Sequence, residues 1–150
     1  PGRLLLQRED GLFASAESEA NAVNNAYGIT PLISDFNQDG YPDIIYVNLQ
    51  GKSRALISNA GENRYLNFAM PDNACCLGAK ITVTLKDGRT LTDYIVKNEG
   101  LSSSQTGTVF FGLGKDGEAA TVDMQLQNGR RFHIKNVGYN RSITFDPDDI

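Results

Sequence analysis

The cleanest alternation in the chain is that of Lys80-Ile81-Thr82-Val83-Thr84-Leu85. Polar and apolar residues alternate along it, and successive side chains of an extended chain point to opposite faces. Ile81, Val83 and Leu85 therefore share one face, which we expect to point inward, while the threonines face outward. The stretch predicts a β-strand with one buried and one solvated side.

Turn signals divide the rest of the chain into short extended segments. Asp87-Gly88 and Asn128-Gly129 favour two-residue hairpin turns. Residues 14–25 have a helical composition, but their apolar content is nearly all alanine, so we expect irregular turns there. Further strands are expected at residues 3–7, 27–33, 43–48, 54–58, 91–96, 108–111, 120–126, 131–135 and 142–145. This spacing predicts an all-β protein whose main part is an antiparallel β-sandwich.

Composition narrows the classes of partner. The 150 residues carry a formal net charge of −4, and the pI is about 4.9. Because no basic stripe is present, we expect no nucleic-acid partner. No apolar run approaches the length of a membrane span, so we expect no membrane insertion. The chain starts at Pro1 without Met, and we expect it to be excised from a longer protein, with a removed export signal as the alternative.

The chemistry of the chain is concentrated in residues 35–43, Asp-Phe-Asn-Gln-Asp-Gly-Tyr-Pro-Asp, which run directly into the apolar segment 44–47. Ca²⁺ takes roughly six to eight oxygen ligands in a flexible shell. Gly40 permits the sharp turn that such a loop needs. The candidate ligands are the side chains of Asp35, Asn37, Asp39 and Asp43 and the backbone carbonyl of Tyr41. The pattern predicts a calcium site; Mg²⁺ is disfavoured because it demands a tighter octahedron.

Two alternatives compete with this interpretation of the acidic loop. An EF-hand requires a bidentate Glu at the twelfth position and a helix on each side. The twelfth position here is Tyr46, inside a β-branched run that favours a strand. The other alternative is a turn rich in Asp and Asn that binds no ion, since these residues also serve ordinary turns.

The acidic loop and its flanks resemble an FG-GAP/VCBS repeat of β-propellers, including the integrin α-subunit type. The resemblance rests on residues 34–48, on Asp10-Gly11-Leu12-Phe13, and on residues 3–7, which look like the end of a preceding blade. It implies a structural calcium loop between two blade strands. A propeller needs about four to eight blades, so we expect a partial, blade-like sheet attached to the sandwich.

Residues 65–145 resemble the ASPIC/UnbV module, which follows FG-GAP repeats in cartilage acidic protein and its bacterial relatives. The matching stretches are residues 65–68, 77–83, 111–114, 128–130 and 136–141. Two departures are the absence of Trp and the presence of Cys75-Cys76. With the loop at residues 59–63 as boundary, we expect an FG-GAP/VCBS-like unit at 1–59 and an ASPIC/UnbV-like sandwich at 60–150.

Three residues outside the loop could carry chemistry. Cys75 and Cys76 are adjacent, and a vicinal disulfide, a pair of thiols and links to another chain all stay open. No spacing suggests zinc. His133 shares its strand parity with Arg131 and Lys135, so we expect it to face solvent.

These patterns predict a non-enzymatic, calcium-binding module that is secreted or at the cell surface, in an extracellular or periplasmic setting. Its role would be adhesion or protein recognition, with a protein or glycan partner or with the rest of a longer propeller-containing chain. The alternative is a carbohydrate-binding β-sandwich, indicated by the polar loop 102–105 and by Tyr94 and Tyr139. Catalysis is disfavoured because no nucleophile has a plausible base and the acidic residues are concentrated in the loop or scattered on turns.

Overall fold

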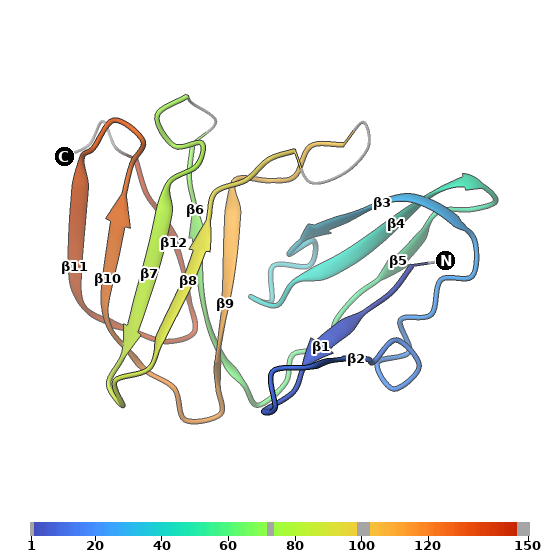
Figure 1. The fold of residues 1–150 in the computed structure, drawn as a ribbon, viewed down its shortest axis with the longest axis horizontal. Coiled ribbons are helices and arrows are strands. Elements are labelled where there is room, and N and C mark those ends of the chain that lie inside the picture. Colours follow the sequence, from blue (N-terminus) through green and yellow to red (C-terminus); the bar gives the residue numbers. More distant parts are fainter. Residues whose placement is uncertain (1, 72–73, 99–102, 147–150) are drawn as a thin grey trace.

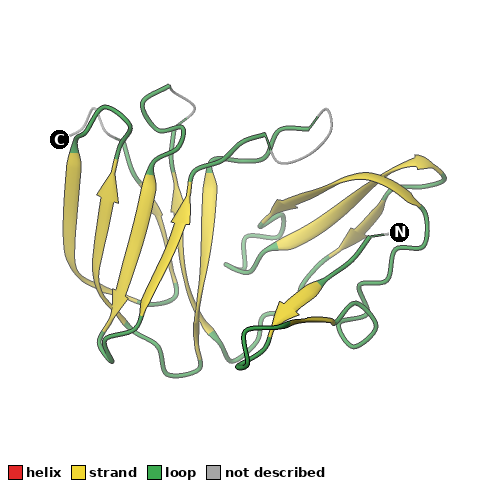
Figure 2. Ribbon diagram, viewed as in Figure 1, coloured by secondary structure: helices red, strands yellow, loops and turns green. Residues whose placement is uncertain are grey.

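The computed structural model describes residues 2–71, 74–98 and 103–146, and these ranges consist of strands and loops without a helix (Figure 2). The all-β prediction is confirmed. The strands are β1 (Leu5–Gln7), β2 (Phe13–Ser15), β3 (Tyr27–Ser34), β4 (Asp43–Gln50), β5 (Arg54–Leu56), β6 (Arg64–Ala69), β7 (Lys80–Leu85), β8 (Thr90–Tyr94), β9 (Thr108–Gly114), β10 (Ala119–Gln125), β11 (Arg131–Gly138) and β12 (Arg141–Thr144). Within the described ranges, nothing helical is long and apolar enough to cross a membrane.

Strands β6 to β12 form a sandwich of two sheets (Figure 1). One sheet has the order β11-β10-β7-β8 and the other the order β12-β6-β9. All pairings are antiparallel except that of β12 with β6, which is parallel. Both expected hairpins are present, because β7 pairs with β8 across Asp87-Gly88 and β10 pairs with β11 across Asn128-Gly129.

The hydrophobic core lies between these two sheets. Ile81, Val83 and Leu85 point into it with exposures of 0%, 0% and 2%, as the alternation predicts, whereas His133 is exposed. The largest fully buried apolar side chains come from both sheets: Phe68, Leu66, Ile81, Leu85, Leu113, Met124, Leu126, Val83 and Val122. The whole core cluster falls between Leu66 and Phe145, so the sandwich accounts for most of the apolar burial.

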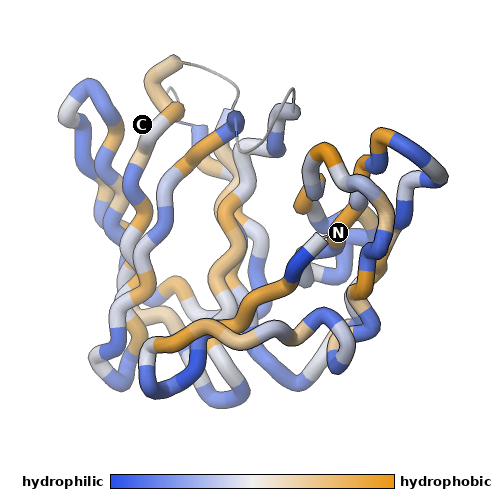
Figure 3. Tube along the Cα trace, turned by 45° about the vertical axis from the view of Figure 1, so that its right-hand side comes forward, coloured by the Kyte–Doolittle hydropathy of each residue, from blue (hydrophilic) through white to orange (hydrophobic). Residues whose placement is uncertain are grey.

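The first part of the chain forms a three-stranded sheet, β3-β4-β5, and a β1-β2 hairpin. Few apolar side chains are buried in this part of the chain. Tyr46 is one of them, and its ring lies against Gly2. Many large apolar side chains stay exposed here instead: Leu5, Leu6, Leu12, Phe13, Tyr27, Ile29, Ile33, Phe36, Leu49 and Ile57. Figure 3 shows the hydrophobic run along the N-terminal strand. We refer to β1–β5 together as the blade-like sheet; residues 57–63 connect it to the sandwich.

Strand β6 differs from the expected set of strands, because alternation does not reveal it. Leu66, Asn67 and Phe68 are buried in succession, with exposures of 0%, 2% and 0%. Leu66 and Phe68 belong to the core cluster, while Asn67 contacts the acidic loop on the other side of the strand. A strand covered on both faces loses the period of two that marks a half-buried strand.

Candidate metal centre

The acidic loop connects β3 to β4, whose antiparallel register pairs Ser34 with Asp43. The backbone turns back on itself between these residues, with φ of 62° at Gln38 and 93° at Gly40. Both values lie in the left-handed region, which glycine and, less readily, a few other residues adopt. The predicted sharp turn at Gly40 is confirmed.

Asp35 holds the first half of the loop together. Its Oδ1 accepts a hydrogen bond from the backbone N–H of Asp39 over 3.0 Å, and its Oδ2 accepts one from Gly40 over 2.8 Å. Asn37 Oδ1 accepts from the backbone N–H of Asp39 over 3.2 Å, and Asn37 Nδ2 donates to Asp39 Oδ2 over 2.9 Å. The backbone therefore wraps around the side-chain oxygens of these residues.

Asp39 and Asp43 hold the second half. Asp39 Oδ1 accepts from the backbone N–H of Tyr41 over 2.9 Å. Asp43 is fully buried, and its Oδ2 accepts from the backbone N–H of Phe36 over 2.8 Å. Its Oδ1 accepts from the backbone N–H of Ser58 over 2.8 Å and from the Ser58 hydroxyl over 3.2 Å. Asp43 thus joins the loop to Ser58, two residues after β5.

Asp43 is an acidic residue in a fully buried position, which is unusual. Among the described residues, no lysine, arginine or histidine forms an ion pair with it. Buried charges in proteins are normally paired or coordinate a metal. Each carboxylate oxygen has two lone pairs, so acceptance of one N–H leaves room for a cation at Asp35 and at Asp43 Oδ2. The donor set is chemically suited to a hard cation.

The carboxylates do not converge on one point, however. Over residues 2–71, 74–98 and 103–146, no three His, Cys, Asp or Glu side chains are grouped closely enough to hold a metal ion. The predicted ligands lie along one loop, and their oxygens are directed at backbone N–H groups. This pattern of hydrogen bonds is also the one expected of an ordinary Asp- and Asn-rich turn.

The loop packs against the sandwich through two residues of β6. Asn67 Nδ2 donates to the backbone carbonyl of Gly40 over 2.9 Å. The Tyr65 ring covers Gly40 so closely that a Cβ atom on Gly40 would lie 1.9 Å from Tyr65 Cζ. Tyr41 meets the same ring edge-on, with ring centroids 5.4 Å apart.

Ser58, Tyr65 and Asn67 are the residues of this region that the sequence did not single out as partners of the loop. Asn67 carries the one usable signal, a polar residue between Leu66 and Phe68 in an otherwise apolar run. A buried amide needs a hydrogen-bond partner, but the sequence does not say where in the chain that partner lies.

The family model described as "ASPIC and UnbV" matches residues 70–150. This range is more than half of the 150 residues. The chain belongs to the ASPIC and UnbV family. The matched range covers most of the sandwich and leaves the acidic loop outside, so the FG-GAP/VCBS resemblance of residues 1–59 stays a prediction. The comparison with curated proteins returned no match.

A polar segment of the ASPIC/UnbV sandwich makes a second contact with the blade-like sheet. Gln105 Nε2 donates to the carbonyl of Pro31 over 2.8 Å, and Gln105 Oε1 accepts from the N–H of Ile33 over 3.0 Å. Thr30 Oγ1 donates to Ser103 Oγ over 3.1 Å. Ser103 and Gln105, which suggested a glycan site, are therefore engaged with β3, while Ser102 lies outside the described residues.

The residues outside the loop that could carry chemistry, Cys75, Cys76 and His133, lie in the ASPIC/UnbV sandwich. Cys76 is buried in the core, Cys75 is half-buried, and their sulfurs lie 3.7 Å apart. His133 Nδ1 lies 2.7 Å from Asp123 Oδ1 on the exposed sheet face. Asn140, which lies in the family-like stretch 136–141, has a φ of 51° and exchanges hydrogen bonds with the backbone of Tyr65, so it holds this stretch against β6.

Proposed function

We propose that this chain is a non-enzymatic module, secreted or displayed at the cell surface, in which residues 35–43 bind a structural Ca²⁺ ion. The observation that carries the proposal is Asp43, a carboxylate with 0% exposure that has no cationic partner in the described part of the chain. A divalent cation would supply the missing positive charge. It would also relieve the repulsion among Asp35, Asp39 and Asp43.

The chemistry of the donors favours calcium. All are oxygens, from carboxylates, one amide and one backbone carbonyl, and calcium accepts such mixed shells at flexible geometry. Extracellular calcium modules bind with dissociation constants of about 10⁻⁴–10⁻³ M. A site of this strength would be filled where calcium is millimolar, as it is in the extracellular setting that we propose.

The position of the loop favours a structural role for the ion. Gly40 and Tyr41 are held by Tyr65 and Asn67 of the sandwich, and Asp43 is bonded to Ser58, two residues after β5. Ion binding would therefore stiffen the joint between the blade-like sheet and the sandwich.

Adhesion or protein recognition is the role that this arrangement supports. The blade-like sheet exposes large apolar side chains such as Phe13, Tyr27 and Leu49, and such surfaces mark protein contacts. We propose a protein partner for them, either a separate chain or the rest of a longer propeller-containing chain.

Isothermal titration of the chain with calcium chloride tests the proposal. We expect one site with a dissociation constant of about 10⁻⁴–10⁻³ M and its loss in Asp39→Ala, which leaves the hydrogen bonds of Asp43 in place. The same titration with Asp10→Ala is the control, because Asp10 accepts a comparable turn hydrogen bond from Leu12 outside the loop. If the titration of the unmodified chain gives no binding heat, residues 35–43 form an ordinary turn that binds no calcium.

A further inference from the structure

The outer face of the four-stranded sheet carries two rows of polar side chains that run across the strands. The register aligns Arg131 with Gln125, Gln125 with Lys80, and Lys80 with Tyr94. A second row follows in the same order of strands: His133, Asp123, Thr82 and Thr92. Neighbouring strands are about 4.8 Å apart, so the first row places Lys80 and Arg131 about 10 Å from each other across Gln125.

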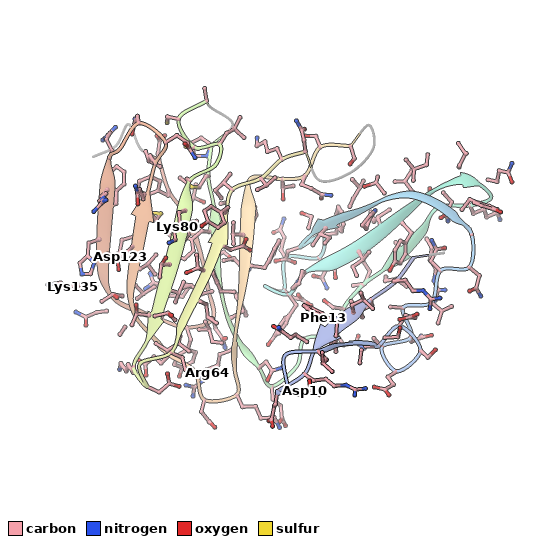
Figure 4. The ribbon with its side chains drawn as sticks, viewed as in Figure 1. Asp10, Phe13, Arg64, Lys80, Asp123 and Lys135 are labelled. Carbon is pink, nitrogen blue, oxygen red and sulfur yellow. The ribbon has the colours of Figure 1, made fainter. Side chains whose placement is uncertain are left out.

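This face is positive in a protein that is negative overall. Lys80, Arg131 and Lys135 are exposed there, and Asp123 is the acidic residue among them; Figure 4 labels three of these residues over the four-stranded sheet. Three cations and one anion give the face a formal charge of +2, with His133 neutral, against −4 for the chain. Within the described residues the three cations have no ion-pair partner.

Two adjoining hollows follow the first row. One has a volume of about 360 Å³ and is lined by residues of β7, β10 and β11, including Lys80, Gln125 and Arg131. The other, of about 240 Å³, is lined by Lys80, Gln125 and Tyr94 and by Gln127 and Gly129 of the β10–β11 turn. Lys80 and Gln125 line both hollows, so the two adjoin, and we refer to them together as the groove. A ligand that occupied both would extend along the first row, as a linear polymer can.

We propose that this groove binds an acidic polysaccharide, a chain of sugars that carry carboxylate or sulfate groups. Lys80 and Arg131 would pair with the acidic groups, and Arg131 can do so with two parallel N–H bonds. The Tyr94 ring, half-exposed at the end of the row, offers an apolar surface for a sugar ring. Asp123, whose Oδ1 already contacts His133, has a second oxygen to accept a hydrogen bond from a sugar hydroxyl.

The same residues argue against nucleic acid as the occupant. Nucleic-acid sites neutralise several phosphates and stack successive bases on aromatic rings. This face has a formal charge of +2, one exposed aromatic ring in the row and a carboxylate at its centre, which would repel a phosphate. A sugar chain tolerates the carboxylate because its hydroxyls are hydrogen-bond donors.

The inference does not rest on the calcium loop. Its residues belong to β7, β8, β10, β11 and the turn between β10 and β11, whereas the proposed calcium ligands lie in the β3–β4 connection and at the first residue of β4. A chain that fails to bind calcium can still bind the polysaccharide, and the reverse holds too. The two proposals therefore fail independently.

Titration calorimetry without added calcium tests the inference with four probes: sodium polygalacturonate, dextran sulfate, uncharged dextran and single-stranded oligothymidine. We expect binding of one or both acidic polysaccharides that weakens as salt is added, and no binding of uncharged dextran. Binding of neither acidic polysaccharide overturns the inference. Equal or tighter binding of oligothymidine also overturns it, because the face would then be a general or nucleic-acid anion site.

Variants locate the site. The double variant Lys80→Gln/Arg131→Gln should bind about tenfold more weakly or worse, since each removed cation loses charge-assisted hydrogen bonds. Arg8→Gln/Lys52→Gln makes the same charge change on exposed residues of the blade-like sheet and should bind as the unmodified chain does. Circular dichroism verifies that both double variants are folded. Equal weakening in both would show that net charge, and not the groove, controls binding, and would overturn the assignment.

Discussion

The side-chain amide of Asn67 donates to the backbone carbonyl of Gly40 over 2.9 Å, across 27 positions of the sequence. Asn67 is 2% exposed and belongs to the sandwich, while Gly40 is buried in the acidic loop. The amide also reaches Ser142 Oγ over 3.4 Å, so it bridges β12 and the loop. This contact makes the loop part of the sandwich wall, so the two predicted units at 1–59 and 60–150 share a buried contact.

Replacement of Asn67 by alanine should destabilise the chain. The Gly40 carbonyl would lose its donor while still buried, and an unsatisfied buried polar group costs about 1–3 kcal/mol. Urea unfolding followed by circular dichroism measures the change. Asn59→Ala, at an exposed position of the loop before β6, should stay within about 0.5 kcal/mol of the unmodified chain. Equal effects of the two variants would show that the Asn67 contact contributes nothing to stability.

Gly40→Ala should lower the free energy of unfolding more than Gly51→Ala does. The comparison isolates one contact, that of Gly40 with the Tyr65 ring. Both glycines have left-handed φ values, 93° and 98°, so alanine strains the backbone at each by about 1–2 kcal/mol. A Cβ on Gly51 meets nothing within 4 Å, whereas a Cβ on Gly40 would lie 1.9 Å from Tyr65 Cζ. Overpacking adds about 1–3 kcal/mol at Gly40 alone.

A double-mutant cycle verifies the origin of that difference. In a Tyr65→Ala background the ring is absent, so Gly40→Ala should cost no more than Gly51→Ala. The coupling between positions 40 and 65 is then the clash itself. An undiminished cost of Gly40→Ala in that background would assign the effect to the backbone and not to the ring.

Calcium should raise the melting temperature of the chain. A ligand at about fifty times its dissociation constant stabilises the folded state by about 2 kcal/mol, which corresponds to about 5 °C for a domain of this size. Differential scanning fluorimetry in calcium chloride and in EDTA measures the shift. Asp39→Ala should lose the shift and Asp10→Ala should keep it. Identical melting curves in calcium and EDTA would contradict a structural ion.

Alternation of polar and apolar residues predicts the strands that have one solvent-exposed face and one buried face. The alternation predicts both ends of β7, because Ile81, Val83 and Leu85 are buried while Lys80 is exposed, and the Asp87-Gly88 turn identifies its partner strand. β6 could not be found in this way. Asn67 is buried against the loop and its neighbours against the core, so no polar face remains to give a period of two.

The acidic loop shows a similar division between local and long-range information. A tight turn with inward-pointing oxygens is predictable from Asp35, Asn37 and Asp39, because their hydrogen bonds are made within five residues of the chain. What covers the turn is set by Tyr65, more than twenty positions later. Only the docking of β6 brings that ring to Gly40, and no local pattern encodes it. β6, the strand that departs from alternation, is therefore also the strand at which the blade-like sheet and the sandwich meet.

Acid should weaken the chain partly through Glu17. The hydrogen bond from the Arg3 guanidinium, together with backbone hydrogen bonds and the Arg3 charge, lowers the pKa of Glu17 below its ordinary value, and the carboxylate is largely buried. A lowered folded-state pKa means that the stabilisation is complete above the unfolded-state pKa of about 4.3. It is lost as the pH falls through the lower folded-state value, because the unfolded chain binds the proton more readily.

Glu17→Gln should therefore flatten part of the acid limb of the stability curve, measured by urea unfolding from neutral pH to below pH 4. Arg3→Gln should move the onset of the Glu17 contribution to a higher pH, since the main cause of the lowered pKa is removed. Asp87, whose pKa is lowered by the backbone N–H and side chain of Arg89, keeps some acid dependence in both variants. An acid limb unchanged by Glu17→Gln would show that the Arg3–Glu17 contact does not persist in solution.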